Sequence, residues 1–453
     1  MNALFSPFLF EKAKCFLNNS NNILLLSHLD ADGLTSASII ALFLKKMDKT
    51  FTVRIIKQLE NINEIKETKS DLVIITDMGS GQFGLLKEVI NERKIIIIDH
   101  HQVQDQFEHE NLVHFNPALY DDTISASGVS YIVIKGLNPG FEDKSYLSLI
   151  GAIGDNQFEE GFKGLNLELL NDFVEKGIIK KIKGLNVFGR VSKPVHEALS
   201  NNFDLIIPGV NGNESAAIQL LSDINIDLKN SDGSWKTLAN MSEQEMKKLV
   251  TNIIMRRISH NLDPNIISDV LEISNESGLT SDLKEWSVLL NSSGRQGFQS
   301  LGVLLNMGYK SYALPKIDDL LKEYRKTLTK SLEYVKMNSL LLNDLLVIDG
   351  KSEIPDTMIG TVIGMALNSM EYDTINTIIG FADRENETKV SCRTKTSINI
   401  GEVLAKVCKK LNFKGGGHKK AGGAVISKES KELFLNSFSE ETRGEMLIKD
   451  GFV

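Results

Sequence analysis

Apolar runs of strand length recur along the first third of the chain. Residues 23–26, 72–76, 95–98 and 147–153 consist almost entirely of apolar side chains, and helical patterns separate them between about residues 21 and 161. Continuous apolar runs of this length are typical of strands buried on both faces. Alternation of such strands with helices indicates βαβ units. The pattern therefore predicts an α/β fold whose N-terminal domain has a mainly parallel sheet flanked by helices.

The pattern changes after about residue 163. Residues 163–308 read as helical and irregular, whereas residues 317–342 contain neither Gly nor Pro and predict one long helix. Residues 345–348, 375–381 and 388–394 read as strands, with a helix at about 357–370. We therefore expect a catalytic domain at 1–190, a helical inserted or linking module at 191–315, a connecting helix at 316–342, and a smaller α/β domain at 343–453.

Composition narrows the classes of protein that fit. A chain of 453 residues with 42% hydrophobic and 24% charged residues fits a globular protein of two or three domains. The formal net charge of -8 argues against a broad basic surface for duplex nucleic acid. Three cysteines without a C-x-x-C pair make a disulfide framework improbable. No signal-peptide pattern is present, and no apolar run approaches the ~18 residues of a membrane span. We expect a cytoplasmic protein with no membrane partner.

Acidic residues and histidines follow each of the four predicted strands. His28, Asp30 and Asp32 follow the first run, and alternation places them on the same side of an extended backbone. A single Asp after a strand is more often a turn residue or a helix cap. Four such strand ends in one segment instead indicate a common site at the carboxyl edge of the sheet. The remaining residues at these ends are Asp77, Asp99, His100, His101 and Asp155.

The donor types favour a particular class of metal. A site rich in carboxylates, with few imidazoles and no thiolate, suits Mn²⁺ or Mg²⁺ better than structural zinc. Four carboxylates balance two divalent cations, and two cations about 3.5–4 Å apart activate water for attack on phosphorus. One carboxylate must then bridge the two ions. Asp77, alone on its predicted strand, is our hypothesis for this bridge.

These motifs resemble a known family. The four segments HLDADG, TDMG, DHH and GAIGD closely resemble the motifs of DHH phosphoesterases, and KGGGHKKAGGA at 414–424 resembles the glycine-rich signature of the DHHA1 domain of RecJ-like proteins. The resemblance spans residues 20–426. It implies two divalent cations, Mn²⁺ first and Mg²⁺ as the alternative. One ion would be held by His28, Asp30 and Asp77, and the other by Asp32, Asp77, His100 and Asp155.

The resemblance also implies roles around these ions. His101 would face the substrate phosphate, and Asp99 would orient a histidine rather than bind metal. For His101, the alternative is a core histidine that hydrogen-bonds only to backbone.

A second group of residues is expected to bind substrate. The backbone N–H groups of Gly415, Gly416 and Gly417 would approach a phosphate closely, although a glycine cluster alone is more often a flexible turn. Ser391 and Arg393, two apart on one strand face, would contribute a hydroxyl and a planar guanidinium. LLNSSGRQG at 289–297 resembles the N-x-x-GR segment of RecJ-like exonucleases and implies that Arg295 grips a strand. His418 would also donate to phosphate.

Three functions remain open at this point. The resemblance favours a metal-dependent exonuclease of the archaeal RecJ-like type, acting on single-stranded DNA, RNA or both, with 5′→3′ polarity favoured. The alternative is a phosphodiesterase or phosphatase for short oligonucleotides, cyclic dinucleotides or phosphoadenosine phosphate, whose family members are usually shorter. A third reading is a replisome scaffold with little activity, with GINS-type replication proteins as partners. The sequence leaves DNA or RNA preference, polarity, native metal and oligomeric state open.

Overall fold

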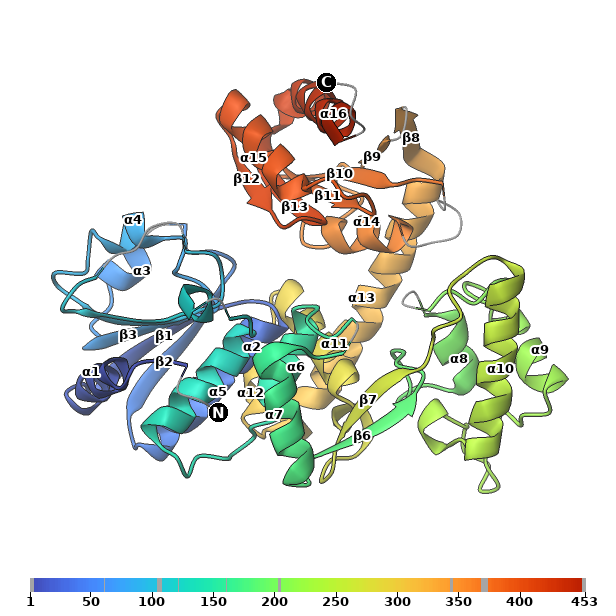
Figure 1. The fold of residues 1–453 in the computed structure, drawn as a ribbon, viewed down its shortest axis with the longest axis horizontal. Coiled ribbons are helices and arrows are strands. Elements are labelled where there is room, and N and C mark those ends of the chain that lie inside the picture. The colour runs from blue at the N-terminus through green and yellow to red at the C-terminus, as the bar shows by residue number, and fades with distance from the viewer. Residues whose placement is uncertain are drawn as a thin grey trace. The chain divides into compact units, whose positions relative to one another are not determined.

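The computed structural model describes residues 4–449 apart from 61, 104–107, 121, 160, 203–204, 343–344 and 368–373. The chain forms two compact units (Figure 1). The first unit consists of Met1–Asn201 and Ile207–Leu321, and the second of Asn202–Ile206 and Lys322–Val453. None of the described helices is long and apolar enough to cross a membrane.

A five-stranded parallel sheet lies at the centre of the first unit. Its strand order is β2-β1-β3-β4-β5, and every neighbouring pair is parallel. This confirms the predicted α/β fold. The two edge strands were not predicted, because β2 lacks the continuous apolar run of the inner strands and β5 is only four residues long. The strands are β1 (Asn22–His28), β2 (Thr50–Ile56), β3 (Leu72–Thr76), β4 (Lys94–Ile98) and β5 (Leu112–Phe115).

Helices cover both faces of this sheet (Figure 1). Successive strand residues supply the two cores: Ile74 and Ile96 face one layer, and Ile75 and Ile97 face the other. The first layer consists of α1 (Pro7–Asn18), α2 (Ala31–Lys46) and α5 (Ala126–Leu137). The second layer contains the short helices α3 (Asn63–Lys66) and α4 (Phe83–Leu86). A short 3₁₀ helix, η1 (Pro117–Tyr120), follows β5.

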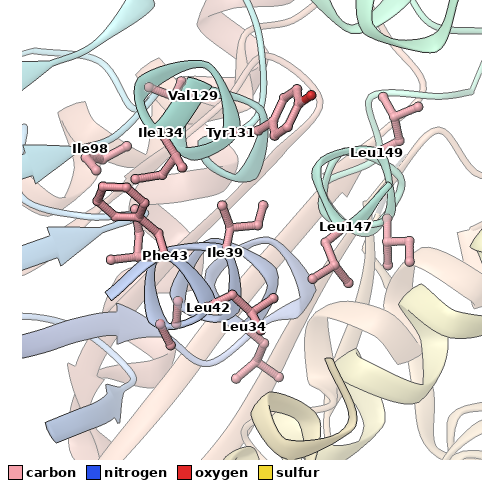
Figure 2. Packing of buried hydrophobic residues seen from close by; sticks show 14 of the residues in the cluster. Leu34, Ile39, Leu42, Phe43, Ile98, Val129, Tyr131, Ile134, Leu147 and Leu149 are labelled. Carbon is pink, nitrogen blue, oxygen red and sulfur yellow. The ribbon is translucent and has the colours of Figure 1, made fainter. Parts of the chain in front are cut away.

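Helix α2 is buried along most of its length. Every residue from Ala31 to Leu44 is buried, because the sheet, α5 and α6 (Leu147–Gly154) all pack on it. Figure 2 shows Leu34, Ile39 and Phe43 of α2 among side chains of α5 and α6. A helix that is apolar all round is stable only in such surroundings. The first turn of α2, which contains Asp32, is therefore held in a fixed position.

The predicted fourth strand is wrong. Residues 147–153 belong to α6, so Asp155 follows a helix rather than a strand. A short run that is apolar at every position has no period that separates a buried strand from a buried helix. Gly151 and Gly154 allow α6 to approach α2 closely, which an extended strand would not require.

The rest of the first unit surrounds a two-stranded antiparallel sheet. Strands β6 (Ile179–Gly184) and β7 (Ser268–Ile273) flank a mainly helical insertion. Buried Arg190 ties this insertion to the N-cap of the following helix through Asp282, 3.1 Å away, and to β7 through Glu272. The helices are α7 (Gly164–Glu175), α8 (Val195–Ser200), α9 (Glu214–Asp223), η2 (Leu238–Asn240), α10 (Glu243–Ser259), η3 (Gly278–Thr280), α11 (Leu283–Arg295) and α12 (Gln299–Asn306).

The second unit is a smaller α/β structure, as predicted. Its six-stranded mixed sheet has the order β12-β13-β11-β10-β9-β8. Helices α13 (Lys310–Asn338) and α14 (Ile359–Leu367) pack on one face, and α15 (Ile400–Leu411) and α16 (Lys431–Lys449) pack on the other. The strands are β8 (Ser339–Leu342), β9 (Leu345–Asp349), β10 (Thr377–Arg384), β11 (Glu387–Thr394), β12 (Lys414–Gly417) and β13 (Ala421–Ser427).

Two predicted helices of this region differ from the structure in their limits. The long helix begins at Lys310 and includes Pro315, and its predicted last four residues form β8 instead. The helix predicted at 357–370 is observed as α14, and its last three predicted residues lie outside the described part of the chain. The boundary between the two units falls inside α13.

Candidate metal centre

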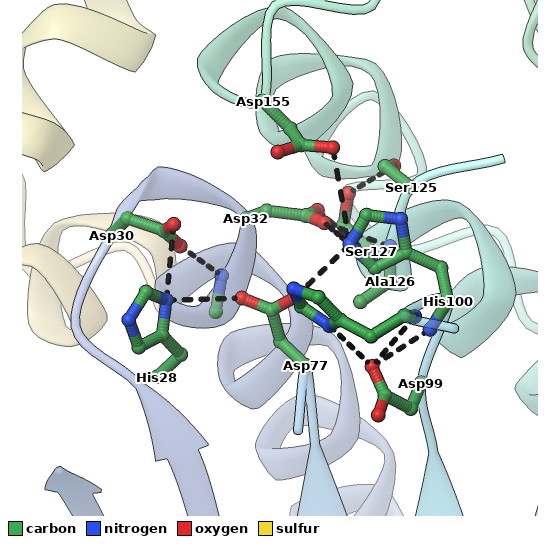
Figure 3. A network of polar contacts seen from close by, with 12 residues as sticks. His28, Asp30, Asp32, Asp77, Asp99, His100, Ser125, Ala126, Ser127 and Asp155 are labelled. Atoms are coloured by element: carbon green, nitrogen blue, oxygen red, sulfur yellow. Dashed lines mark hydrogen bonds and ion pairs between the residues drawn. The ribbon is translucent and has the colours of Figure 1, made fainter. Parts of the chain in front are cut away.

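The structure brings all six predicted metal ligands together at the carboxyl edge of the parallel sheet (Figure 3). His28 ends β1, Asp30 is the N-cap of α2, and Asp32 lies in the first turn of that helix. The expectation that these three residues alternate on an extended strand is therefore wrong, because the chain enters a helix at Ala31. The other three ligands follow β3, β4 and α6: Asp77, His100 and Asp155.

The first group of donors consists of His28, Asp30 and Asp77. Nδ1 of His28 lies 3.0 Å from Oδ2 of Asp30 and 3.4 Å from Oδ2 of Asp77. Donor atoms of these three residues lie within 4.8 Å of one another, which is close enough to share one ion.

The second group of donors is centred on His100. Its Nε2 lies 3.8 Å from Oδ2 of Asp32 and 3.8 Å from Oδ2 of Asp155. The same Nε2 lies 3.4 Å from Oδ1 of Asp77. Asp77 thus presents one carboxylate oxygen to each group, which is the arrangement that the predicted bridge requires. A third triplet of donors, Asp77, His100 and His101, overlaps with these two groups.

Asp77 reaches this position through an unusual backbone conformation. Its φ of +57° lies in the left-handed region, where Asp is tolerated better than most residues with a side chain. Its N–H donates to the carbonyl of Ile98 on β4 at 3.0 Å. The backbone therefore turns sharply at the end of β3 and directs the carboxylate between the two groups.

Backbone N–H groups hold Asp32 in place. The carboxylate accepts from the N–H groups of Ala126 at 2.7 Å and Ser127 at 2.9 Å, at the start of α5. Helix N-termini favour such negative charges. Gly151 lies directly above: a Cβ there would come within 2.1 Å of the Ser127 hydroxyl and 2.5 Å of Asp32. The small residues at the start of α5 thus allow its backbone to lie directly against Asp32.

Helix α11 supports the loop between His28 and Asp32. The N–H of Ala31 donates to Oδ1 of Asn291 at 3.0 Å, and a Cβ on Gly294 would come within 1.8 Å of the Leu29 carbonyl. Oδ1 of Asp30 accepts from the N–H of Gly33, which leaves Oδ2 facing His28. Asn291 and Gly294 belong to the N-x-x-GR segment at 289–297, but their contact with a loop 260 residues away is visible only in the tertiary fold.

Burial raises the pKa of Asp30, but His28 outweighs it and lowers the value. The carboxylates of Asp32 and Asp155 instead have raised pKa values. Burial, then the charge of Asp77, raises the pKa of Asp32 to about 8, against the opposing effect of His100. Burial also raises the pKa of Asp155. For His100, burial lowers the pKa, but Asp77, Asp32 and Asp155 outweigh it and raise the value to about 10. Burial is likewise outweighed at His28, whose pKa rises because of Asp30 and Asp77.

The donor set fits divalent cations. Oδ2 of Asp77 is buried and accepts no hydrogen bond from any described residue. Oxygen and imidazole donors without a thiol suit Mn²⁺ or Mg²⁺, and a cation would offset the clustered negative charge.

Asp99 forms a different set of contacts from the six predicted ligands. It is fully buried and accepts from the backbone N–H groups of Ser80, His100 and His101 at 2.8–3.2 Å. Nδ1 of His101 lies 2.8 Å from Oδ1 of Asp99. Burial raises the pKa of Asp99, but these hydrogen bonds and the histidines outweigh it and lower the value. The carboxylate is thus placed to orient His101, whose side chain is 47% exposed.

The other predicted substrate-binding residues occupy two places. Arg295 is the last residue of α11 and is half-buried in the first unit. In the second unit, Ser391 and Arg393 share the face of β11 toward α14, where a Cβ on Gly360 would lie 3.5 Å and 3.0 Å from them. Ser391 pairs with Gly423 of β13, which pairs with Gly416 of β12.

The glycine cluster of the second unit is a strand rather than a flexible turn. Gly415, Gly416 and Gly417 belong to β12 and pair with β13. Gly416 and Gly417 have φ of +159° and +154°, and a Cβ on Gly417 would lie 2.4 Å from the Ala421 carbonyl. His418 is exposed just after the strand, and its N–H donates to Ala421.

A parallel sheet with a histidine and carboxylate centre at its carboxyl edge, followed by a second α/β unit, defines a class of metal-dependent phosphoesterases. Family models match the chain in three places: the DHH family N-terminal domain at residues 22–152, the DHH-CID domain at 187–271 and the DHHA1 domain at 343–444. The chain belongs to the DHH/DHHA1 superfamily, whose phosphoesterases are metal-dependent hydrolases. The domain limits given above stay predictions.

The individual proteins that this chain resembles have low sequence identity to it. An uncharacterised protein of Methanocaldococcus jannaschii is 29% identical over 447 residues, which cover 95% of each chain. A prophage-derived protein of Bacillus subtilis, provisionally named as a single-strand DNA-specific exonuclease, is 31% identical over 176 residues, which cover 37% of this chain but only 30% of that protein.

Two solved structures share the fold. CDC45 from Entamoeba histolytica has a TM-score of 0.68 at 11% identity, with 96% of this chain and 98% of that chain covered. RecJ from Thermus thermophilus in complex with Mn²⁺ has a TM-score of 0.60 at 18% identity, with 97% of this chain and 56% of that chain covered.

Proposed function

We propose that this protein is a metal-dependent exonuclease that hydrolyses single-stranded DNA, RNA or both, in the 5′→3′ direction. The observation that carries the proposal is the position of Asp77, which presents one carboxylate oxygen to each of two donor groups. The relative named as a single-strand DNA-specific exonuclease and the fold shared with RecJ support this substrate class.

We further propose that the resident ions are two Mn²⁺, with Mg²⁺ as the alternative. The residues His28, Asp30 and Asp77 would hold one ion, and Asp32, Asp77, His100 and Asp155 the other. Two such cations supply Lewis acidity to a phosphoryl group and lower the pKa of water toward neutrality. Asp77 would contribute to both ion sites, while α2 and the N-terminus of α5 fix Asp30 and Asp32.

The remaining residues hold the substrate in this proposal. His101, oriented by Asp99, donates to a phosphate oxygen or to the leaving oxygen. Arg393 and Ser391 bind a phosphate beside the glycine strand β12, whose backbone allows close approach. Arg295 and His418 contribute further donors to the phosphates of the strand.

The test follows end-labelled single strands of about 20 nucleotides with Mn²⁺ or Mg²⁺. We expect a product ladder from one end, and its direction in 5′- and 3′-labelled DNA and RNA defines polarity and preference. Asp77→Asn should lower kcat at least a hundredfold, because the neutral amide no longer balances two ions. The substitution keeps the left-handed backbone, which Asn also tolerates.

Asp48→Asn is a matched control. Asp48 is exposed and has the same backbone conformation, with a φ of 56°, so its substitution should leave the rate unchanged. Intact strands with the wild-type protein under both metals would contradict the proposal. Equal activity of Asp77→Asn and the wild type would contradict the bridging role.

Two alternatives are separated by related measurements. If dinucleotides, cyclic dinucleotides or phosphoadenosine phosphate are cleaved faster than strands, the enzyme is a small-substrate phosphodiesterase or phosphatase. The fold shared with CDC45 favours a replisome scaffold, for which co-purification with GINS-type proteins without hydrolysis is the expected result. The close grouping of all six ligands favours an active enzyme over that scaffold.

A further inference from the structure

We infer that Asn116 and Ser80 are positioning residues that fix the orientation of His101. The inference rests on the proposed function, since it assigns His101 a contact with substrate. Neither Asn116 nor Ser80 belongs to the two groups of metal donors. Both are fully buried and come from separate loops at the carboxyl edge of the sheet.

Asn116 uses both ends of its side-chain amide. It follows β5 directly, and its Nδ2 donates to the carbonyl of His101 at 2.8 Å and to the hydroxyl of Ser80 at 2.8 Å. Its Oδ1 accepts from the N–H of Ala118 at 2.9 Å, which fixes the amide plane. A buried side chain with all these partners is held in one rotamer.

Ser80 connects this amide to Asp99. Its N–H donates to Oδ2 of Asp99 at 2.9 Å. Its hydroxyl oxygen accepts from Asn116 and lies 2.9 Å from Nε2 of His114. Burial lowers the pKa of His114 to about 4, so its ring is neutral and Nε2 can accept.

His101 is therefore held at two points. Asn116 binds its backbone carbonyl, and Asp99, which Ser80 holds, binds ring atom Nδ1. The two contacts fix the backbone and the rotation of the imidazole, which leaves the opposite ring edge toward solvent and substrate. Loss of either contact should affect the function of His101 and leave the six metal ligands in place.

The experiment uses Asn116→Ala and Ser80→Ala in the full chain, each also combined with His101→Ala. Asn116→Ala should lower kcat about 10–100-fold, the usual effect of a lost supporting hydrogen bond, with KM and the Kd for Mn²⁺ nearly unchanged. Ser80→Ala should have a smaller effect, because the backbone N–H to Asp99 remains. In the His101→Ala background neither substitution should lower kcat further, because the residue that they position is absent.

Asn306→Ala is the matched control for folding. Asn306 is equally buried and also uses both ends of its amide, accepting from Trp286 at 3.0 Å and donating to Ser38 at 3.1 Å. It should lower Tm as much as Asn116→Ala and leave kcat unchanged. Additive losses with His101→Ala, or a loss of Mn²⁺ affinity that accounts for the lower rate, would overturn the inference.

A failure of the proposed function can be distinguished from a failure of the positioning role of Asn116. If the wild type hydrolyses no strand, the function is wrong, but the NMR resonance of the His101 Nδ1–H still reports its hydrogen bond to Asp99. That resonance should shift in Asn116→Ala and stay in place in Asn306→Ala. An unchanged resonance in Asn116→Ala would overturn the positioning role by itself.

Discussion

Gly151 shows how little room the proposed metal centre has at the scale of single residues. It lies where α6 crosses Asp32, Ser127 and Thr35, and a Cβ at this position would lie within 2.5 Å of an atom of each. Glycine is normally unfavourable inside a helix by about 1 kcal/mol relative to alanine. The close approach of α6 to Asp32 explains why the helix nevertheless contains it.

Gly151→Ala should therefore destabilise the protein and lower its activity. Overpacking of a close contact costs about 1–3 kcal/mol in the free energy of unfolding, which exceeds the gain in helix propensity. The displaced Asp32 should also bind its ion less tightly. Urea unfolding and Mn²⁺ titration measure the two effects.

Gly84→Ala is the matched control, since Gly84 lies in helix α4 with nothing within 4 Å of an added Cβ. It should be neutral or slightly stabilising. Unchanged stability and metal affinity in Gly151→Ala would show that α6 can move away.

At the scale of elements, α11 joins two parts of the first unit. Its first turn carries Asp282 and buried Glu285, which bind Arg190 and the N–H of Val191 at the base of the inserted segment. Its last turns carry Asn291 and Gly294, which contact the loop between His28 and Asp32. The helix thus places a segment from late in the chain against the loop that carries the predicted ligands His28, Asp30 and Asp32.

Asn291→Ala should weaken metal binding more than it weakens the fold. The substitution leaves the N–H of Ala31 without its acceptor, at a cost of about 1–3 kcal/mol, and loosens the start of α2 between Asp30 and Asp32. We expect the Kd for Mn²⁺ to rise about tenfold, measured by calorimetry or by Mn²⁺ EPR.

Ser287→Ala is the matched control, because it changes a residue of the same helix that does not bind the N–H of Ala31. Ser287 is buried, and among the described residues its hydroxyl donates only to the carbonyl of Lys284 in the same helix. It should leave Mn²⁺ affinity unchanged. Equal affinities for Asn291→Ala and Ser287→Ala would refute a supporting role for Asn291.

At the scale of the whole molecule, the bound ions should stabilise the first unit. Their proposed ligands come from β1, α2, and the chain after β3, β4 and α6, so two cations would link segments spread over more than a hundred residues. They would also offset the repulsion among four carboxylates that share two imidazoles. An ion that binds only the folded state raises stability by mass action.

Addition of Mn²⁺ to metal-free protein should therefore raise Tm. At a concentration a hundred times Kd, one site contributes about 2.7 kcal/mol. Removal of the ions with EDTA should reverse the increase, and Asp77→Asn should greatly reduce it. Differential scanning fluorimetry measures these shifts, and the same increase in wild type and Asp77→Asn would place the stabilising ion elsewhere.

Much of the fold and of the candidate centre could be predicted from the sequence. Apolar strands such as β3 and β4 are continuous along the chain, and their polar ends identified Asp77 and His100 as candidates. The glycine signature near the C-terminus likewise predicted a substrate-binding region, although its form as strand β12 was open. These features are patterns of residue types over short stretches of the chain, which a single sequence shows directly.

The chain alone predicted the six candidate metal ligands and the core strands β1, β3 and β4 that lead to His28, Asp77 and His100. The three-dimensional fold was needed to show that residues 147–153 form a helix, that Asp30 and Asp32 lie at the start of a helix, and that Asn116, Asn291 and Gly151 contact residues of the candidate centre. The physical reason is that a fully apolar run carries no periodicity. Hydrogen bonds and close contacts between distant segments likewise leave no local pattern in a single chain.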